Sequence, residues 1–130
     1  MATDKETIIY SYTRQQAIED GSFVDVSPTA KEAGFRWPVA VTRHVWDSLI
    51  EPTEKAKGYG QDLQGRLWDV LWMLRSAIRN AEPGERLVVY DVIFQDGPGP
   101  RNRKTVRLWA AVEDAGDGSP AITIMLPEDY

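Results

Sequence analysis

One stretch of the sequence, Gly65 to Ala81, constrains the fold more than any other. Its apolar residues recur every three or four positions, which is the period of a helix with one buried face. That apolar stripe consists of Leu67, Val70, Leu71, Leu74, Ala77, Ile78 and Ala81. So wide a stripe must pack on a sheet or on other helices, so we expect this segment to be the main helix of a globular domain.

A second group of side chains on the adjacent flank of the same helix consists of Trp68, Trp72, Arg75 and Arg79. Tryptophan and arginine are enriched among the residues that dominate protein–protein binding, and an arginine over an indole adds a cation–π contact. These four residues are therefore candidates for a protein-interaction surface. The alternative, which the pattern favours, is that a helix over residues 42–50 covers both indoles, through Trp46.

The N-terminal half predicts short strands and helices in alternation. Expected strands are Ile8–Tyr12, Ser22–Val26 and Trp37–Val41, and expected helices are Arg14–Asp20, Ser27–Gly34 and Arg43–Ile50. Thr13 and Thr42 are suitable N-caps for two of these helices. Pro38 favours an edge position for its strand, because proline has no N–H to donate to a neighbouring strand.

The C-terminal part reads as three strands over residues 86–95, 104–112 and 121–126. Short links between them predict an antiparallel meander. Both faces of the first strand are apolar, which is typical of a central strand covered on both sides. The predicted fold class is therefore α+β: a C-terminal three-stranded antiparallel meander packed by one main helix, with short N-terminal strands and helices.

Length and composition indicate one domain over residues 1–130, with residues 1–7 disordered and 51–64 a mobile loop. The chain has no cysteine, which excludes disulfides and thiolate chemistry. Its polar start and the lack of a long apolar run predict a cytoplasmic protein without a membrane span. We expect a monomer or a homodimer.

The net charge of −5 is concentrated at the C-terminal end. Residues 113–130 contain no Lys or Arg, and their acidic residues are Glu113, Asp114, Asp117, Glu128 and Asp129. Such a chain is a poor general binder of nucleic acid, which requires a positive surface. An acidic end could contact a basic partner, although a solvated tail is the simpler interpretation.

A basic cluster is the candidate nucleic-acid surface, and it consists of Arg101, Arg103, Lys104, Arg107 and Trp109. Arg107 and Trp109 fall on the same face of a strand. That pairing would combine charge for a phosphate backbone with a ring for base stacking. A solvated hairpin tip would look the same in sequence.

No catalytic residue, metal site or cofactor is predicted. His44 is the only histidine, and the start of a helix disfavours its charged form. The carboxylates Asp25, Asp69 and Asp91 interrupt apolar segments, and together with His44 they would be the residues of a small hydrolase if they converged. Phosphate-binding glycine motifs are absent from the sequence.

Five segments resemble a family of short, functionally uncharacterised bacterial and phage proteins, often found on plasmids and other mobile elements. They are Tyr12–Thr13 followed by Ala17–Gly21, then Val24–Val26, Pro38–Thr42, Gly65–Met73 and Ile122–Pro127. The resemblance implies a compact intracellular protein from a mobile genetic element, and it implies no activity or catalytic residue.

These observations together predict a small non-catalytic interaction or regulatory protein that binds a host or element protein. Two alternatives stay open: a single-stranded nucleic-acid accessory module that uses the basic hairpin, and a small carboxylate-based hydrolase.

Overall fold

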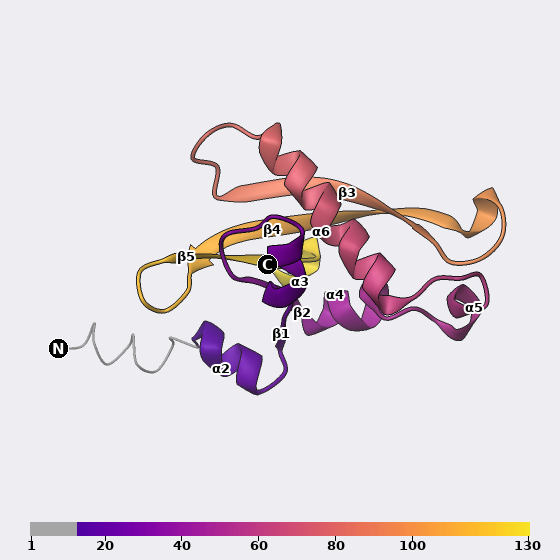
Figure 1. Cartoon of the computed structure of the whole chain (residues 1–130), viewed down its shortest axis with the longest axis horizontal. Helices are drawn as coiled ribbons and strands as arrows, with labels where there is room; N and C mark the ends of the chain where they lie inside the picture. The colour runs from indigo at the N-terminus through magenta and orange to yellow at the C-terminus, as the bar shows by residue number, and fades with distance from the viewer. Residues whose placement is uncertain (1–12) are drawn as a thin grey trace.

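The computed structural model describes residues 13–130 as a five-stranded mixed sheet with its main helix on one face (Figure 1). The helices are α2 (Arg14–Glu19), α3 (Ser27–Glu32), α4 (Arg43–Val45), α5 (Glu54–Lys57) and α6 (Leu63–Arg79). The strands are β1 (Phe23–Asp25), β2 (Val39–Thr42), β3 (Leu87–Gln95), β4 (Arg103–Asp114) and β5 (Pro120–Met125). A π-helical turn over Trp46–Ile50 follows α4, and 3-10 turns cover Pro100–Asn102 and Pro127–Asp129. The α+β class is confirmed.

The strand order is β1-β2-β5-β4-β3, in which only β2 and β5 run parallel. Strands β3, β4 and β5 do pair antiparallel in succession. The predicted three-stranded meander is nevertheless only part of the sheet, because β5 also pairs with β2, and β2 pairs with β1. That parallel contact joins segments about eighty residues apart, so no local turn in the sequence could indicate it.

Two predicted strand positions are wrong. Strand β2 is internal, and all four of its residues are buried. Pro38 is compatible with this position because it precedes the strand and contributes only its carbonyl, which accepts a hydrogen bond from the Ile122 N–H (2.9 Å). Strand β3 is an edge strand rather than a central one. Its Val89 and Ile93 are 48% and 59% exposed, so one of its apolar faces lies open.

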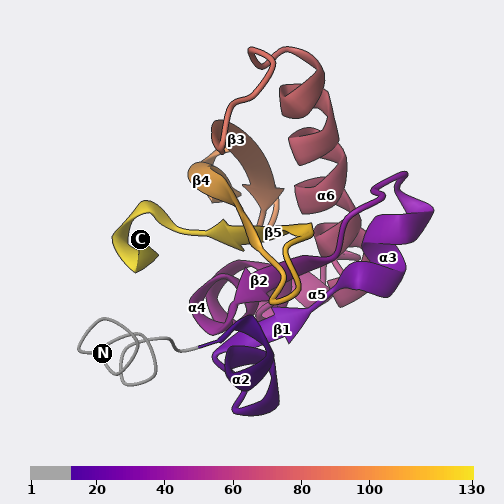
Figure 2. The same cartoon turned by 90° about the vertical axis from the view of Figure 1, so that its left-hand side faces the viewer.

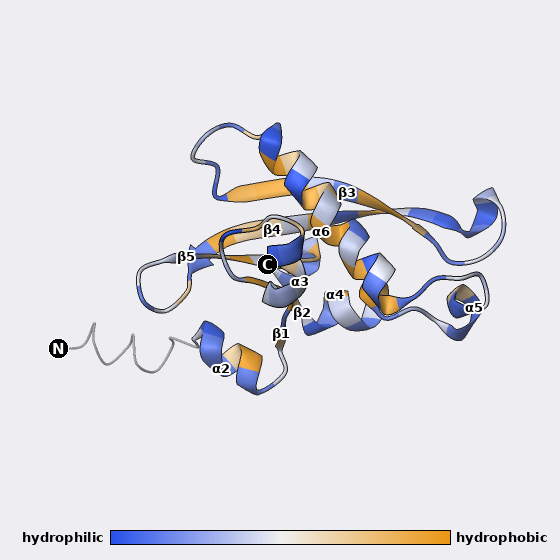
Figure 3. Ribbon diagram, viewed as in Figure 1, coloured by the Kyte–Doolittle hydropathy of each residue, from blue (hydrophilic) through white to orange (hydrophobic). Residues whose placement is uncertain are grey.

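Helix α6 forms the expected main helix and packs against the sheet. It begins at Leu63, two residues before the predicted start, because the Asp62 carboxylate accepts a hydrogen bond from the Gly65 N–H (2.6 Å). Its buried face meets β3, where the Tyr90 hydroxyl donates to the Val70 carbonyl (3.1 Å). Figure 3 shows hydrophobic residues along α6, β3 and β4, where the core lies.

The sheet separates two unequal layers. Helices α6 and α3 lie on one side of β3 and β4, and the C-terminal turn lies on the other (Figure 2). Helix α2 is held to β5 by Arg14, which donates to the Ile122 carbonyl (2.7 Å) and to the Thr123 hydroxyl. No helix in residues 13–130 covers the face of β3 that carries Val89 and Ile93.

Several local predictions can be compared directly with the structure. Thr13 caps α2 as predicted, and Thr42 caps α4. The helix expected over 43–50 is α-helical only as far as Val45 and then becomes a π-helical turn. The segment 51–64 contains the short helix α5, while its mobility stays a prediction. The expected strand Ile8–Tyr12 and the expected disorder of 1–7 lie outside the described residues.

Candidate interaction surfaces

The outward side of α6 carries three large exposed side chains, Trp68, Trp72 and Met73, which we call the aromatic flank. Their exposed fractions are 37%, 44% and 43%. The two indoles stack on each other with centroids 6.0 Å apart and planes 14° from parallel. The prediction that residues 42–50 cover them is wrong. Trp46 instead packs against the core, so the π-helical turn leaves the flank open.

A hollow of about 350 Å³ joins this flank to the sheet edge and is lined by Trp68, Asp69, Trp72, Met73, Val92 and Ile93. Partial burial raises the pKa of Asp69 above its ordinary value, and the nearby Arg66 charge only partly opposes this. The hollow thus combines aromatic and aliphatic walls with one carboxylate. This is the chemistry of a site for an apolar side chain accompanied by a hydrogen-bond donor.

Arg75 is a positioning residue beneath the flank. Its Nη1 donates to the Ala33 carbonyl at the end of α3 (3.0 Å), and its guanidinium lies 5.4 Å from the Trp72 ring centre. Gly34 has φ +99°, a backbone conformation that L side chains rarely adopt, so glycine is favoured there. A Cβ at this position would also lie 2.8 Å from the Arg75 guanidinium carbon and displace that side chain. Arg79, in the last turn of α6, is exposed and extends the same side of the helix.

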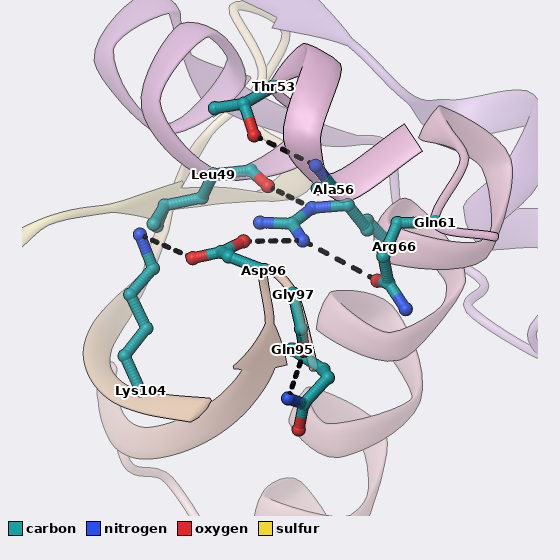
Figure 4. Close-up of polar contacts among 9 residues, drawn as sticks. All are labelled: Leu49, Thr53, Ala56, Gln61, Arg66, Gln95, Asp96, Gly97 and Lys104. Carbon is teal, nitrogen blue, oxygen red and sulfur yellow. Dashed lines mark hydrogen bonds and ion pairs between the residues drawn. The ribbon is translucent and has the colours of Figure 1, made fainter. Parts of the chain in front are cut away.

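Sequence reasoning missed Arg66, whose side chain is only 3% exposed (Figure 4). Its Nε donates to the Leu49 carbonyl (2.6 Å) and its Nη1 to the Asp96 carboxylate (3.0 Å). The guanidinium also lies 4.6 Å from the centre of the Phe94 ring. Asp96 is shared with Lys104 at 3.2 Å. Arg66 stands one helical turn before Val70, at the border of the apolar stripe, which is the signal that could have revealed it.

Two of the four basic side chains in the hairpin form ion pairs with carboxylates. Arg107 and Trp109 do share one sheet face, because they pair with Asp91 and Val89 of β3. Arg107 forms a two-point ion pair with Asp91 (3.0 and 3.4 Å), which raises the pKa of Arg107. The Trp109 ring is met edge-on by Tyr130 at 5.3 Å.

Two further members of the basic cluster contact polar neighbours. Lys104 pairs with Asp96, and Arg103 donates to the Gln95 side chain (3.2 Å). Arg101 is exposed in the 3-10 turn at the hairpin tip. The charge available to a phosphate backbone is therefore smaller than the sequence suggested.

The hydrolase candidates do not converge. Asp25 and Asp91 lie on β1 and β3, the opposite edges of the sheet, about 19 Å apart at the usual strand spacing. Asp69 is on α6, across the sheet from the face that holds Asp91. Among residues 13–130 no group of three His, Cys, Asp or Glu side chains is arranged to hold a metal ion. Asp25, Asp69 and Asp91 therefore do not form the shared site that a carboxylate-based hydrolase would need.

His44 instead pairs with Asp129, a contact that the sequence did not indicate. Its Nδ1 lies 2.8 Å from the Asp129 carboxylate. This hydrogen bond raises the pKa of His44, so the prediction of a neutral imidazole is opposed by the structure. Burial favours the neutral form of Asp129, but hydrogen bonds from His44, the Leu126 N–H and Thr42 outweigh it and lower its pKa.

The acidic C-terminal end is mostly used within the fold. Asp114 accepts from the N–H groups of Gly116 and Gly118, and Glu113 lies 3.8 Å from Arg14. Asp117 accepts from Ser119, which lowers the pKa of its carboxyl group. These acids therefore close turns and contact neighbouring residues within the fold.

A separate apolar hollow of about 350 Å³ lies between the C-terminal end of α6 and the sheet. Its walls include Trp37, Leu74, Ile78, Val88 and Ala110, and Glu82 and Glu85 also line it. Trp37 is 45% exposed. The packing of α6 on the sheet is therefore incomplete at this end.

Fold and surfaces together define a small α+β protein whose most distinctive exposed feature is an aromatic helix flank. None of the helices in residues 13–130 has the length and hydropathy of a membrane span. The chain belongs to a family described as a family of unknown function (DUF6573), whose model matches residues 2–130. No curated protein and no solved structure matches it. The expected membership of an uncharacterised family is thereby confirmed.

Proposed function

We propose that this protein is a small non-catalytic interaction or regulatory protein that binds another protein through the aromatic flank. The observation that carries the proposal is the stacked, exposed pair Trp68 and Trp72. A contiguous exposed apolar surface of this kind is typical of docking sites. Tryptophan is also the residue whose burial contributes most often to protein–protein affinity.

Electrostatics and geometry define what the partner must offer. The hollow beside the flank contains Asp69, whose raised pKa reflects partial removal from water. A complementary surface would place an apolar side chain against Trp72 and direct a donor, such as a backbone N–H or a lysine, at this carboxylate. Arg75 is already bonded to Ala33, so it holds the indole in place rather than contacting the partner first.

The cellular setting is part of the proposal. The resemblance to proteins of plasmids and phages supports a mobile-element origin, a cytoplasmic location and a host or element protein as the partner. Binding would modulate the activity of that protein.

A comparison of two matched tryptophan variants tests this function. The double variant Trp68→Ala/Trp72→Ala removes the flank, whereas Trp37→Ala removes an equally exposed indole elsewhere. Tagged wild-type and variant proteins would be used to capture partners from a bacterial host, and the captured protein would then be purified and titrated. We expect the flank variant to weaken binding at least about 30-fold, the loss typical of an interface hot spot.

The control outcomes are equally specific. Trp37→Ala should bind within about threefold of wild type, and both variants should keep a cooperative unfolding transition. Equal binding by all three proteins would show that the flank is not the docking surface. A partner lost only with Trp37→Ala would move the site to the other end of α6.

A second candidate function is single-stranded nucleic-acid binding, favoured by the shared face of Arg107 and Trp109. The neutralisation of Arg107 by Asp91 weakens it. Titration with a fluorescent oligonucleotide at about 50 mM salt tests it, because phosphate-driven binding is strongest at low salt. No binding at that salt concentration would exclude this function.

A further inference from the structure

The outer edge of β3 offers a row of backbone groups that no strand in residues 13–130 uses. Two hydrogen bonds fix the alternation: Val112 N–H to the Arg86 carbonyl and Asp96 N–H to the Asn102 carbonyl, both 2.8 Å. In an antiparallel pair these bonds recur at every second residue. The even-numbered residues of β3 thus direct their backbone groups at β4. The outward-directed residues are Leu87, Val89, Asp91, Ile93 and Gln95.

This edge lacks the features that usually prevent edge-to-edge association. Natural edge strands are short, bulged, interrupted by proline or charged. Strand β3 is nine residues long, contains no proline, and lies at one edge of the sheet (Figure 1). Its only charged residue is Asp91, which Arg107 neutralises. A long apolar edge of this kind is expected to pair with another strand.

We propose that the edge pairs with a second copy of this chain, with the two β3 strands antiparallel about a twofold axis that passes between the two Asp91 residues. The pairing would give one continuous sheet with five strands from each copy. This dimer does not depend on the proposed binding function. It commits the protein to a homodimer, where the sequence left monomer and homodimer open.

The strand is self-complementary in this register, as an isologous twofold contact requires. Asp91 is the central residue of β3, so pairing about it matches the full length of both strands. Val89 then stands opposite Ile93 of the second copy, and Ile93 opposite Val89 of that copy. These two pairs cover the most exposed β-branched residues of the edge. A shift of two residues would break both pairs.

The central pair of aspartates is the one unfavourable feature of this register. Like charges opposite each other destabilise a strand pair. Here each carboxylate keeps its own arginine, because Arg107 binds Asp91 from β4, on the side away from the new strand. The centre of the seam would therefore be a row of two arginines and two aspartates with no net charge.

The same arrangement explains the position of Met73. A twofold axis perpendicular to the sheet places both α6 helices on one face, on either side of the seam. Met73, which lines the hollow with Val92 and Ile93, would lie beside the second copy. Trp68 and Trp72 of both copies would then be presented on the same side of the dimer, and the proposed docking surface would be doubled.

The expected affinity follows from the size of the contact. Nine paired residues form a seam about 30 Å long. With few side chains beyond the strands themselves, such an interface is at the small end of specific protein contacts. We therefore expect a dimer whose population changes with concentration in the micromolar range. Sedimentation of the wild-type protein from about 5 to 500 μM would measure it.

Single cysteines test the register, because the chain contains no native cysteine. Asp91→Cys places two thiols at a hydrogen-bonded pair with Cα atoms about 5.5 Å apart, within the range of a disulfide. Val89→Cys is the matched control on the same edge, and its two thiols would be separated by about four residues, or roughly 14 Å. Mild oxidation should cross-link the first variant at low micromolar concentration and not the second.

A backbone variant tests the hydrogen bonds of the seam. Ile93→Pro removes an N–H that points outward, so the ladder to β4 is retained while a second strand is blocked. Ile93→Thr, which keeps the N–H and a β-branched side chain, is its control. We expect the proline variant to be monomeric at 500 μM with its circular dichroism unchanged, and the threonine variant to lose less than tenfold in dimer affinity.

Three results would overturn the dimer. The first is a wild-type protein that stays monomeric over the whole concentration range. The second is a dimer that Ile93→Pro leaves unchanged while folded. The third is cross-linking of Val89→Cys as fast as Asp91→Cys, which would place the two strands in another register or the contact on another surface.

Discussion

Replacing Arg66 with methionine should destabilise the fold more than any substitution on the surface of α6. Only 3% of the Arg66 side chain is exposed. Methionine keeps most of the chain length over Phe94 but removes the bonds to the Leu49 carbonyl and the Asp96 carboxylate. The loss therefore isolates the polar part of the contact.

The magnitude follows from those two bonds. A hydrogen bond from a charged donor contributes about 1.5–3 kcal/mol, and the 2.6 Å bond to the Leu49 carbonyl is of this kind. Breaking a buried ion pair costs about 3–5 kcal/mol. Asp96 is 25% exposed and keeps Lys104, so its share is at the lower end. With both contributions taken at the lower end of their ranges, we expect a loss of about 4.5 kcal/mol in the free energy of unfolding.

Urea denaturation followed by circular dichroism would measure this loss. Lys104→Ala is the matched control, because its side chain is 47% exposed and its pair with Asp96 should contribute less than about 1 kcal/mol. Limited proteolysis should also cut the segment 51–62 faster in Arg66→Met, since Arg66 ties Leu49 and the hairpin together. A stability within 0.5 kcal/mol of wild type would refute the reasoning.

Three further predictions concern other parts of the molecule. Trp72→Ala should cost less than about 2 kcal/mol, since a fully buried tryptophan would cost 3–5, and the Trp72 emission should be quenched readily by acrylamide; a larger loss would indicate core packing. Because the pKa of His44 is raised in the folded protein, its protonated side chain stabilises the fold below pH 6.5, and this contribution is lost as the pH rises through the raised pKa. The melting temperature of wild type should therefore exceed that of His44→Asn by less at pH 9 than at pH 6. The lowered pKa of Asp129 acts oppositely, and its contribution is lost on acidification. Ala110→Val should fill part of the hollow beside Trp37 and stabilise the protein by about 1 kcal/mol in thermal unfolding; destabilisation would show that the hollow cannot accept the added methyl groups.

Sequence patterns predicted the features that depend on nearby residues and missed the contacts between residues far apart in the chain. The shared face of Arg107 and Trp109 followed from residue alternation within one strand, and the structure confirms it. The ion pair between Arg107 and Asp91 joins β4 to β3, so it depends on a register that alternation alone does not fix. His44 and Asp129 are 85 residues apart, and no local pattern relates them.

The exposure of the aromatic flank could also not be predicted from the sequence. The spacing of Trp68 and Trp72 placed them on one helix face, and that placement is correct. Whether another element covers that face depends on where the polypeptide goes after Thr42. The π-helical turn carries Trp46 into the core, so the indoles are left to stack on each other.

By itself, the sequence determined the local structure of this protein. Thr13, Thr42 and the apolar stripe of α6 specify helices because caps and periodicity act between residues a few positions apart. Only the tertiary structure decided the strand order, which places β2 inside and β3 at the edge. Both strands are strongly apolar in sequence, and burial of apolar surface is not directional. The pairing of β5 with β2 therefore determines which of them is covered and which presents an open edge.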